Sequence, residues 1–96
     1  MPNYGTRASL GSQRITVLTT AVGLTVPDGV GLITIQAEAQ PVRWNDILTA
    51  LPTSTSGQTI AVGQTLNYTE KNMSQLRFIE ATVGGIIEVK YYGPIA

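Results

Sequence analysis

The chain has 96 residues, enough for one domain with one modest hydrophobic core. Six basic residues balance six acidic ones, and only 12% of the residues are charged, about half of the roughly 25% that is usual. Such a neutral chain lacks the basic excess of a nucleic-acid-binding protein. It contains no histidine and no cysteine, which removes the commonest general base, the commonest metal ligand and any disulfide. The composition therefore argues against an enzyme, a metal site, a cofactor and a nucleic-acid partner.

The location of the protein is predicted from two further features. The polar start of the sequence has no apolar stretch typical of a signal peptide. No apolar run approaches the ~18–20 residues that a membrane span needs. We expect a protein that stays in a cytoplasm, or in a particle assembled there, without membrane contact. Because no net charge keeps copies apart, the surface also favours self-assembly.

Residues 1–13 are rich in Gly, Ser and Pro and show no sustained apolar periodicity. This pattern predicts an extended N-terminal arm, with residues 14–96 forming the single domain. Three side chains of the arm are candidate anchors on a partner surface: Tyr4, Arg7 and Leu10.

The first predicted strand is Arg14–Thr20, because β-branched residues dominate it. Pro27, Asp28 and Gly29 predict a turn. The strand that follows, Val30–Ala39, alternates apolar and polar residues and is therefore half-buried. Its inward face is predicted to carry Ile33, Ile35, Ala37 and Ala39.

After Pro41 the alternation resumes with the opposite parity, in Val42 and Trp44. A change of parity is what a bulge or a crossing between two sheets produces, and Pro41 suits either because it donates no ladder hydrogen bond. Residues 45–58 then predict a long connection with at most one helical turn after Asn45 or Asp46.

The remaining sequence predicts short strands separated by turns, with Gly63 in one turn and Gly84-Gly85 as a two-residue hairpin. In the last strand Ile87, Val89 and Tyr91 are expected to face inward. Six to eight short strands without a helix of length predict an all-β fold, a small antiparallel β-sandwich or jelly-roll-like barrel.

Trp44, the only tryptophan, lies between Arg43 and Asp46 and allows two interpretations. The indole could be a platform for a sugar, with the charged groups on its hydroxyls. Alternatively Trp44 fills one end of a small core while Arg43 pairs with Asp46 or Glu38. We favour the structural role and expect the same for Phe78 and Tyr91. Tyr92, next to Tyr91, is a candidate partner contact because tyrosines are enriched at interfaces.

The acidic residues give weaker signals. Glu38, Glu80 and Glu88 could supply paired carboxylates for glycoside hydrolysis, but each falls on the polar parity of a strand, which predicts a solvated face. A calcium site from Asp28, Asp46 and Glu70 would need a denser run of oxygen ligands. We therefore predict neither a catalytic nor a metal site.

From Ile35 to Gly93 a series of short motifs follows one another at characteristic distances. They are Arg43-Trp44, Asp46, Pro52-Thr53, Gly57, Gly63, Leu66, Tyr68, Phe78-Ile79, Ala81-Thr82, Gly84-Gly85, Val89 and Tyr91-Tyr92. In their order and spacing these motifs resemble a family of small proteins of tailed bacteriophages and prophages. One departure is the segment "NDILTALPTSTSG", which is usually short, acidic and glycine-bearing in that family, so no ligand role of that loop is carried over.

The resemblance implies a structural protein of the virion and carries over no catalytic residue. Combined with the neutral all-β module, it leads us to expect a capsid decoration or cement protein. Such a protein would form a homo-oligomer, such as a trimer, on the major capsid protein and contact other virion proteins. A component of the tail, neck or fibre is the alternative within the virion, and a carbohydrate-binding β-module is the alternative from another class.

Overall fold

The computed structural model describes residues 7–94, which form seven strands and one short 3₁₀ helix. The elements are β1 (Arg7–Ile15), β2 (Leu32–Glu38), β3 (Val42–Asn45), β4 (Gln58–Ile60), β5 (Thr65–Tyr68), η1 (Met73–Gln75), β6 (Arg77–Glu80) and β7 (Ile86–Pro94).

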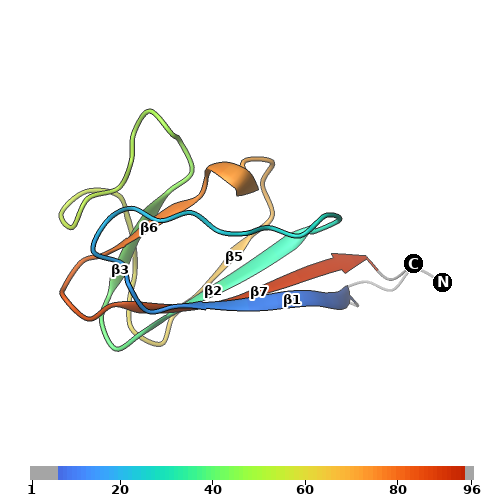
Figure 1. Cartoon of the computed structure of the whole chain (residues 1–96), viewed down its shortest axis with the longest axis horizontal. Helices are drawn as coiled ribbons and strands as arrows, with labels where there is room; N and C mark the ends of the chain where they lie inside the picture. The colour runs from blue at the N-terminus through green and yellow to red at the C-terminus, as the bar shows by residue number, and fades with distance from the viewer. Residues whose placement is uncertain (1–6, 95–96) are drawn as a thin grey trace.

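The strands form two antiparallel sheets (Figure 1). One sheet has four strands in the order β1-β7-β2-β5, and the other has three in the order β4-β3-β6. The two sheets enclose a single cluster of buried side chains, so the prediction of an all-β antiparallel sandwich is confirmed.

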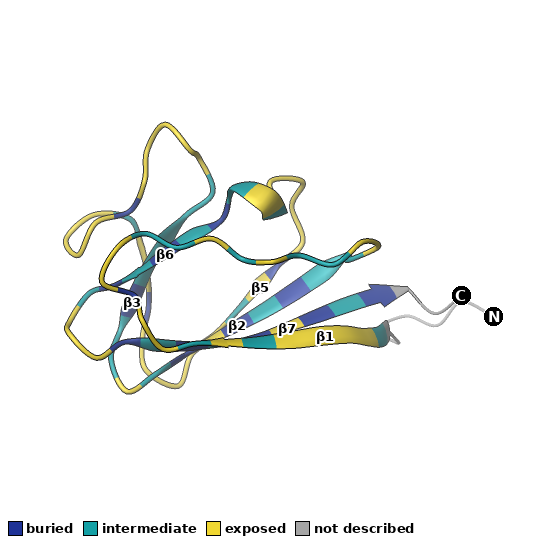
Figure 2. Ribbon diagram, viewed as in Figure 1, coloured by how far each residue is buried: buried dark blue, intermediate teal, exposed yellow. Residues whose placement is uncertain are grey.

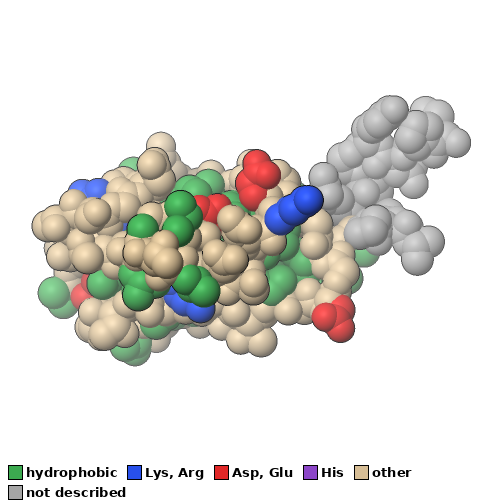
Figure 3. Space-filling view, turned by 90° about the horizontal axis from the view of Figure 1, so that it is seen from above, with side chains coloured by type: hydrophobic (Ala, Val, Ile, Leu, Met, Phe, Trp, Pro, Cys, Tyr) green, Lys and Arg blue, Asp and Glu red, His purple; other side chains and the backbone are tan. Residues whose placement is uncertain are grey.

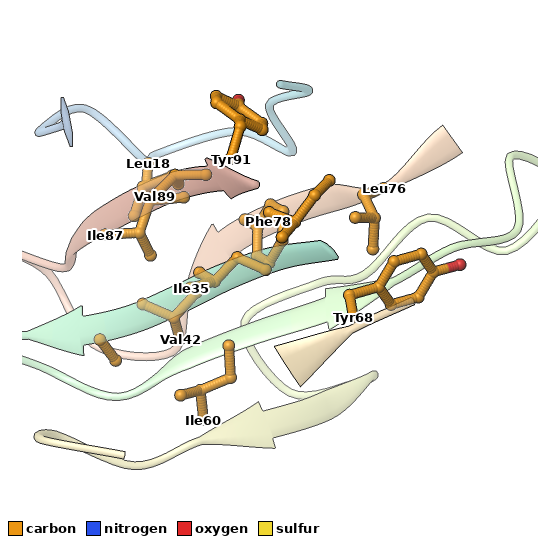
Figure 4. Close-up of a cluster of buried hydrophobic side chains, with 12 residues drawn as sticks. Leu18, Ile35, Val42, Ile60, Tyr68, Leu76, Phe78, Ile87, Val89 and Tyr91 are labelled. Atoms are coloured by element: carbon orange, nitrogen blue, oxygen red, sulfur yellow. The ribbon is translucent and has the colours of Figure 1, made fainter. Parts of the chain in front are cut away.

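The core consists of apolar side chains from the inner faces of both sheets (Figure 4). Along β2 the residues that alternate inward, Ile33, Ile35 and Ala37, are fully buried, as the sequence predicts. The inward residues of β7 are likewise confirmed. The buried residues are Leu18, Ile33, Ile35, Ala37, Val42, Ile60, Tyr68, Leu76, Phe78, Ile87, Val89 and Tyr91.

The chain passes from the larger sheet to the smaller one between β2 and β3. Ala39 has a positive φ of 67°, which places it in the left-handed region and turns it outward, and Pro41 follows before β3 starts. The sequence allowed two explanations of the parity change, a bulge or a crossing between sheets. The structure shows the crossing, because β2 and β3 belong to different sheets.

The prediction of a hairpin at Gly84-Gly85 is wrong. Residues 83 and 84 do form a turn, but β6 belongs to the small sheet and β7 to the large one, so these strands do not pair with each other. Two glycines between strands indicate a reversal of the chain, but they do not determine which strands the flanking residues pair with.

The predicted boundary of the N-terminal arm at residue 13 is also wrong. Residues 7–13 belong to β1, which pairs with β7 along its whole length apart from a register shift between Ser9 and Gly11. Most described residues of β1 are exposed (Figure 2), so the strand has no apolar periodicity in its sequence. An edge strand is held mainly by its backbone hydrogen bonds, which explains why composition suggested an arm.

The predicted strand Arg14–Thr20 is wrong beyond Ile15. The chain instead leaves β1 there, with Val17 outward and 67% exposed and Leu18 fully buried. It then runs along the free side of β6, where the Leu18 carbonyl accepts from the Glu80 N–H at 2.9 Å and Val22 bridges to Phe78. This segment thus covers one edge of the small sheet.

The long connection between β3 and β4 is confirmed, as is the turn at Asp28 and Gly29. A first turn of this connection is closed by the Ala50 N–H, which donates to the Ile47 carbonyl at 3.0 Å, and a second by mutual backbone bonds between Thr53 and Ser56. The Asn45 side chain donates to the Ala50 carbonyl at 2.9 Å, and this tether stabilises the turn. The 3₁₀ helix at Met73–Gln75 has no counterpart in the prediction.

A partly buried hydrogen bond ties β1 to the body of the sheet and gives a test. The Tyr91 hydroxyl donates to Gln13 Oε1 at 2.7 Å, and burial raises the pKa of Tyr91 to about 12. A pKa raised by folding means that stability is constant below the unfolded pKa of about 10 and falls as the pH rises towards 12. Tyr91→Phe should lower the stability at neutral pH by about 0.5–1.5 kcal/mol but should reduce the alkaline loss. Urea unfolding between about pH 7 and about pH 11 measures both effects.

Tyr92→Phe is the matched control, because Tyr92 lies on the other face of β7 with Lys90 Nζ 5.5 Å from its ring centre. This variant should keep the alkaline loss of the wild type. Equal alkaline losses in Tyr91→Phe and the wild type would contradict the prediction.

Candidate functional site

Trp44 lies on the inner side of β3, next to the core but not enclosed by it. It shares its face with Val42, is half-buried and packs against the core cluster. Its ring is 6.0 Å from that of Tyr68, with an interplanar angle of 84°, which is an edge-to-face arrangement. The indole therefore packs against the core and also reaches the surface.

Asp46 is engaged by Tyr68 and not by Arg43. The Tyr68 hydroxyl donates to Asp46 Oδ2 at 2.6 Å, at the outer end of the core cluster. Burial of the ring, and then the bond to the carboxylate, raise the pKa of Tyr68 above its ordinary value. The bond fixes the start of the loop that follows β3.

Arg43 points to the outer side of β3, where it holds the loop of residues 46–57. Its Nε donates to the Ser54 carbonyl and its Nη1 to the Gly57 carbonyl, both at 3.1 Å. The expected ion pair of Arg43 with Asp46 or Glu38 is therefore replaced by two bonds to backbone carbonyls. A guanidinium suits this role because its fixed fork of donors reaches two acceptors at once.

A hollow of about 260 Å³ lies beside Trp44, between the free edges of β4 and β5. Trp44, Ile60 and Leu66 supply apolar surface, while Thr59, Gln64 and Thr65 add polar groups. Sequence analysis singled out Trp44 but missed the others, because they come from two strands whose proximity only the fold creates.

A second hollow, of about 430 Å³, lies between the 46–57 loop and the crossing from β6 to β7. It is lined by Ser54, Ile79 and Val83 among others, and Val83 is 83% exposed. Glu80 also borders it but is only 8% exposed, and its Oε1 accepts from the Gly84 N–H at 3.3 Å. The predicted solvated position of Glu80 is therefore wrong, since its carboxylate supports the crossing.

Glu38 and Glu88 do lie on the polar face, where both meet Arg14. Arg14 Nη1 is 2.7 Å from Glu38 Oε2 and also pairs with Glu88. These contacts link β1, β7 and β2 across the outer face of the large sheet. Both carboxylates thus pair with a cation, and Glu80 belongs to another part of the fold.

The 46–57 loop carries three large apolar side chains in the solvent. Ile47, Leu48 and Leu51 are 49%, 48% and 51% exposed. We call these three residues the loop patch. Figure 3 views the molecule from the side on which this loop projects in Figure 1 and shows several apolar side chains on this face, with charged side chains between and around them. Such a patch commonly marks a contact with another molecule.

The described candidates for partner contact lie near one end of the β1–β7 pair, where Ser9, next to Leu10, pairs with Tyr92. Tyr4 lies outside the described residues, and Arg7 lies in β1 opposite Pro94. Leu10 is 38% exposed and lies close over the backbone of Gly93, so part of its surface is used within the fold. Tyr92 is half-buried, whereas Phe78 and Tyr91, expected to be structural, are buried in the core.

Residues 7–94 contain no helix that is long and apolar enough to cross a membrane. In the same part of the chain no three acidic side chains come together in a way that could hold a metal ion.

No family model, no curated protein and no solved structure matches the chain. The resemblance to bacteriophage proteins therefore stays an expectation based on the motifs quoted above.

The role of Arg43 in holding the loop can be tested by hydrogen exchange. Arg43→Ala removes two bonds from a charged donor, each worth about 1.5–3 kcal/mol when well buried. Arg43 is only partly buried, so we expect amide exchange within residues 46–57 to speed up by about tenfold. Arg77→Ala is the matched control, since Arg77 bonds to the carbonyls of Ser74 and Leu76 instead. Unchanged exchange of the loop in Arg43→Ala would show that Arg43 does not hold it.

Proposed function

We propose that this chain is a non-enzymatic structural protein of a bacteriophage virion, a capsid decoration protein that stabilises the head. The observation that carries the proposal is the loop patch, three apolar side chains exposed together on a loop that Arg43 holds in place. The resemblance of the motifs to small bacteriophage proteins supplies the setting.

The binding free energy that the loop patch can supply favours a partner with many identical binding sites. Full burial of a Leu or Ile side chain is worth about 1.5–3 kcal/mol. About half of each side chain is already buried, so covering all three contributes only about 2–4 kcal/mol. This is too little for stable association of a single copy. Several copies joined in one oligomer, such as a trimer, would bind a repeating lattice through avidity.

The charge of the chain agrees with such a contact. Six basic and six acidic residues give no net attraction for a strongly charged partner. Docking would therefore depend on apolar area and shape, and attachment should be insensitive to salt. The major capsid protein is the partner proposed because its lattice presents the same surface many times.

The copy number in the particle tests the position of the chain in the virion. Quantitative mass spectrometry of purified virions should find this chain in a simple integer ratio to the major capsid protein. That ratio follows from attachment to each repeat of the lattice. Copies that number only a dozen or fewer would place the chain in the neck or tail, and absence from the particle would reject a virion protein.

The loop patch can be tested separately by substitution. The triple variant Ile47→Ser, Leu48→Ser, Leu51→Ser should fold normally, because these side chains are about half exposed, but should no longer bind capsids. Co-sedimentation with capsids that lack this chain measures binding. The double variant Val17→Ser, Val62→Ser is the matched control, since these residues are 67% and 52% exposed and lie elsewhere. Equal binding by the triple variant and the wild type would exclude the loop patch as the docking surface.

A further inference from the structure

The hollow between β4 and β5 combines two kinds of surface. Its apolar surface is the indole of Trp44 with Ile60 and Leu66. Its polar surface is supplied by Thr59, Gln64 and Thr65. None of the six lining residues is charged, so the hollow suits a neutral ligand that has both an apolar face and hydroxyl groups.

The edges of both sheets add hydrogen-bonding groups beside the hollow. β4 pairs only with β3, and β5 pairs only with β2. Each strand therefore has one edge along which peptide N–H and C=O groups lack a strand partner. Gln64 Oε1 accepts from the Ala61 N–H at 2.9 Å, which orients the side chain and leaves its amide N–H groups as donors.

The size of the hollow limits the ligand. Its volume of about 260 Å³ lies just below the roughly 300–1,000 Å³ of pockets that hold drug-sized molecules. It has room for one ring and its substituents. A nucleotide would need cations for its phosphate, and the lining provides none.

We propose that this hollow binds a single neutral sugar ring, with the C–H face of the ring on the indole of Trp44. The sugar hydroxyls, each both donor and acceptor, then bond to Gln64 and to the peptide groups of the two strand edges. This site is separate from the loop patch, and the proposal does not depend on attachment to a capsid.

Trp44 is the only tryptophan of the chain, so its fluorescence reports directly on this hollow. Titration with glucose, galactose, rhamnose and N-acetylglucosamine should change its emission saturably for at least one of them. Because the site holds one small ring, the Kd should be on the order of a millimolar. Glucuronate should bind more weakly, since no lining residue is cationic. In ¹H–¹⁵N spectra the sugar should shift the indole signal of Trp44 and the amides of Thr59 and Leu66.

Gln64→Leu should weaken binding by about fivefold, the loss of one hydrogen bond. Gln75→Leu is the matched control, because Gln75 lies in η1 and does not line the hollow. Its affinity should stay within about twofold of the wild type. Thermal unfolding of both variants shows whether each is folded at the temperature of the titration.

Three results would overturn the proposal. The first is no change in emission up to about 100 mM of any of the four sugars, well above the expected Kd. The second is spectral shifts that map away from the hollow, or equal weakening in both glutamine variants. The third is a dependence of the Trp44 signals on protein concentration without sugar, which would show that a strand of a second copy occupies the edge instead.

Discussion

The close approach of Gly85 to Glu80 is the constraint on which the rest of the sandwich depends. A Cβ atom on Gly85 would lie 2.7 Å from the Glu80 Cβ and 3.5 Å from a methyl group of Val42, so only glycine fits there. The Gly84 N–H donates to the Glu80 carboxylate, and the Ala81 N–H donates to the Pro41 carbonyl at 3.0 Å. Of the four crossings between the sheets, the one from β2 to β3 and the one from β6 to β7 are thereby fastened to each other. These contacts set the direction in which β7 begins. Only in that direction can β7 enter the large sheet, where it pairs with both β1 and β2.

The two long sides of the sandwich differ in how their edge strands are covered. On one side the segment that follows β1 buries Leu18 and bridges to Phe78, which covers the edge of β6. On the other side β4 and β5 are short edge strands, joined directly by residues 61–64, and no described strand pairs with their free edges. The core is complete without that side, because Ile60 and Tyr68 are both buried. The hollow beside Trp44 follows from this asymmetry.

The sequence predicted the parts of the fold in which side-chain burial alternates along one strand. The alternation of Ile33 and Ile35, its reversal at Val42 and the inward face of β7 are all present in the structure. The prediction of the fold from the sequence failed where burial does not alternate along a strand. The residues of β1 are short, polar and mostly exposed, so backbone pairing with β7 leaves no trace in hydropathy. Gly84-Gly85 shows a second limit, because a turn signal is local whereas the choice of partner strand depends on the whole fold. The hollow was equally hidden, since Gln64 and Leu66 meet Trp44 only through the packing of two sheets.

The two candidate binding features are linked through β3. Successive residues of a strand point to opposite faces, so Arg43 and Trp44 diverge from neighbouring positions. Arg43 holds the 46–57 loop, and with it the loop patch, on the outer side of the small sheet. Trp44 lines the hollow from the inner side. A macromolecule on the loop patch and a small ligand in the hollow would therefore approach from different directions. The Tyr68–Asp46 bond connects the loop to the hollow, because it ties the first residue of the loop to β5, a strand that borders the hollow. Because the two surfaces share no lining residue, a partner on the loop patch would leave the hollow open to a small ligand.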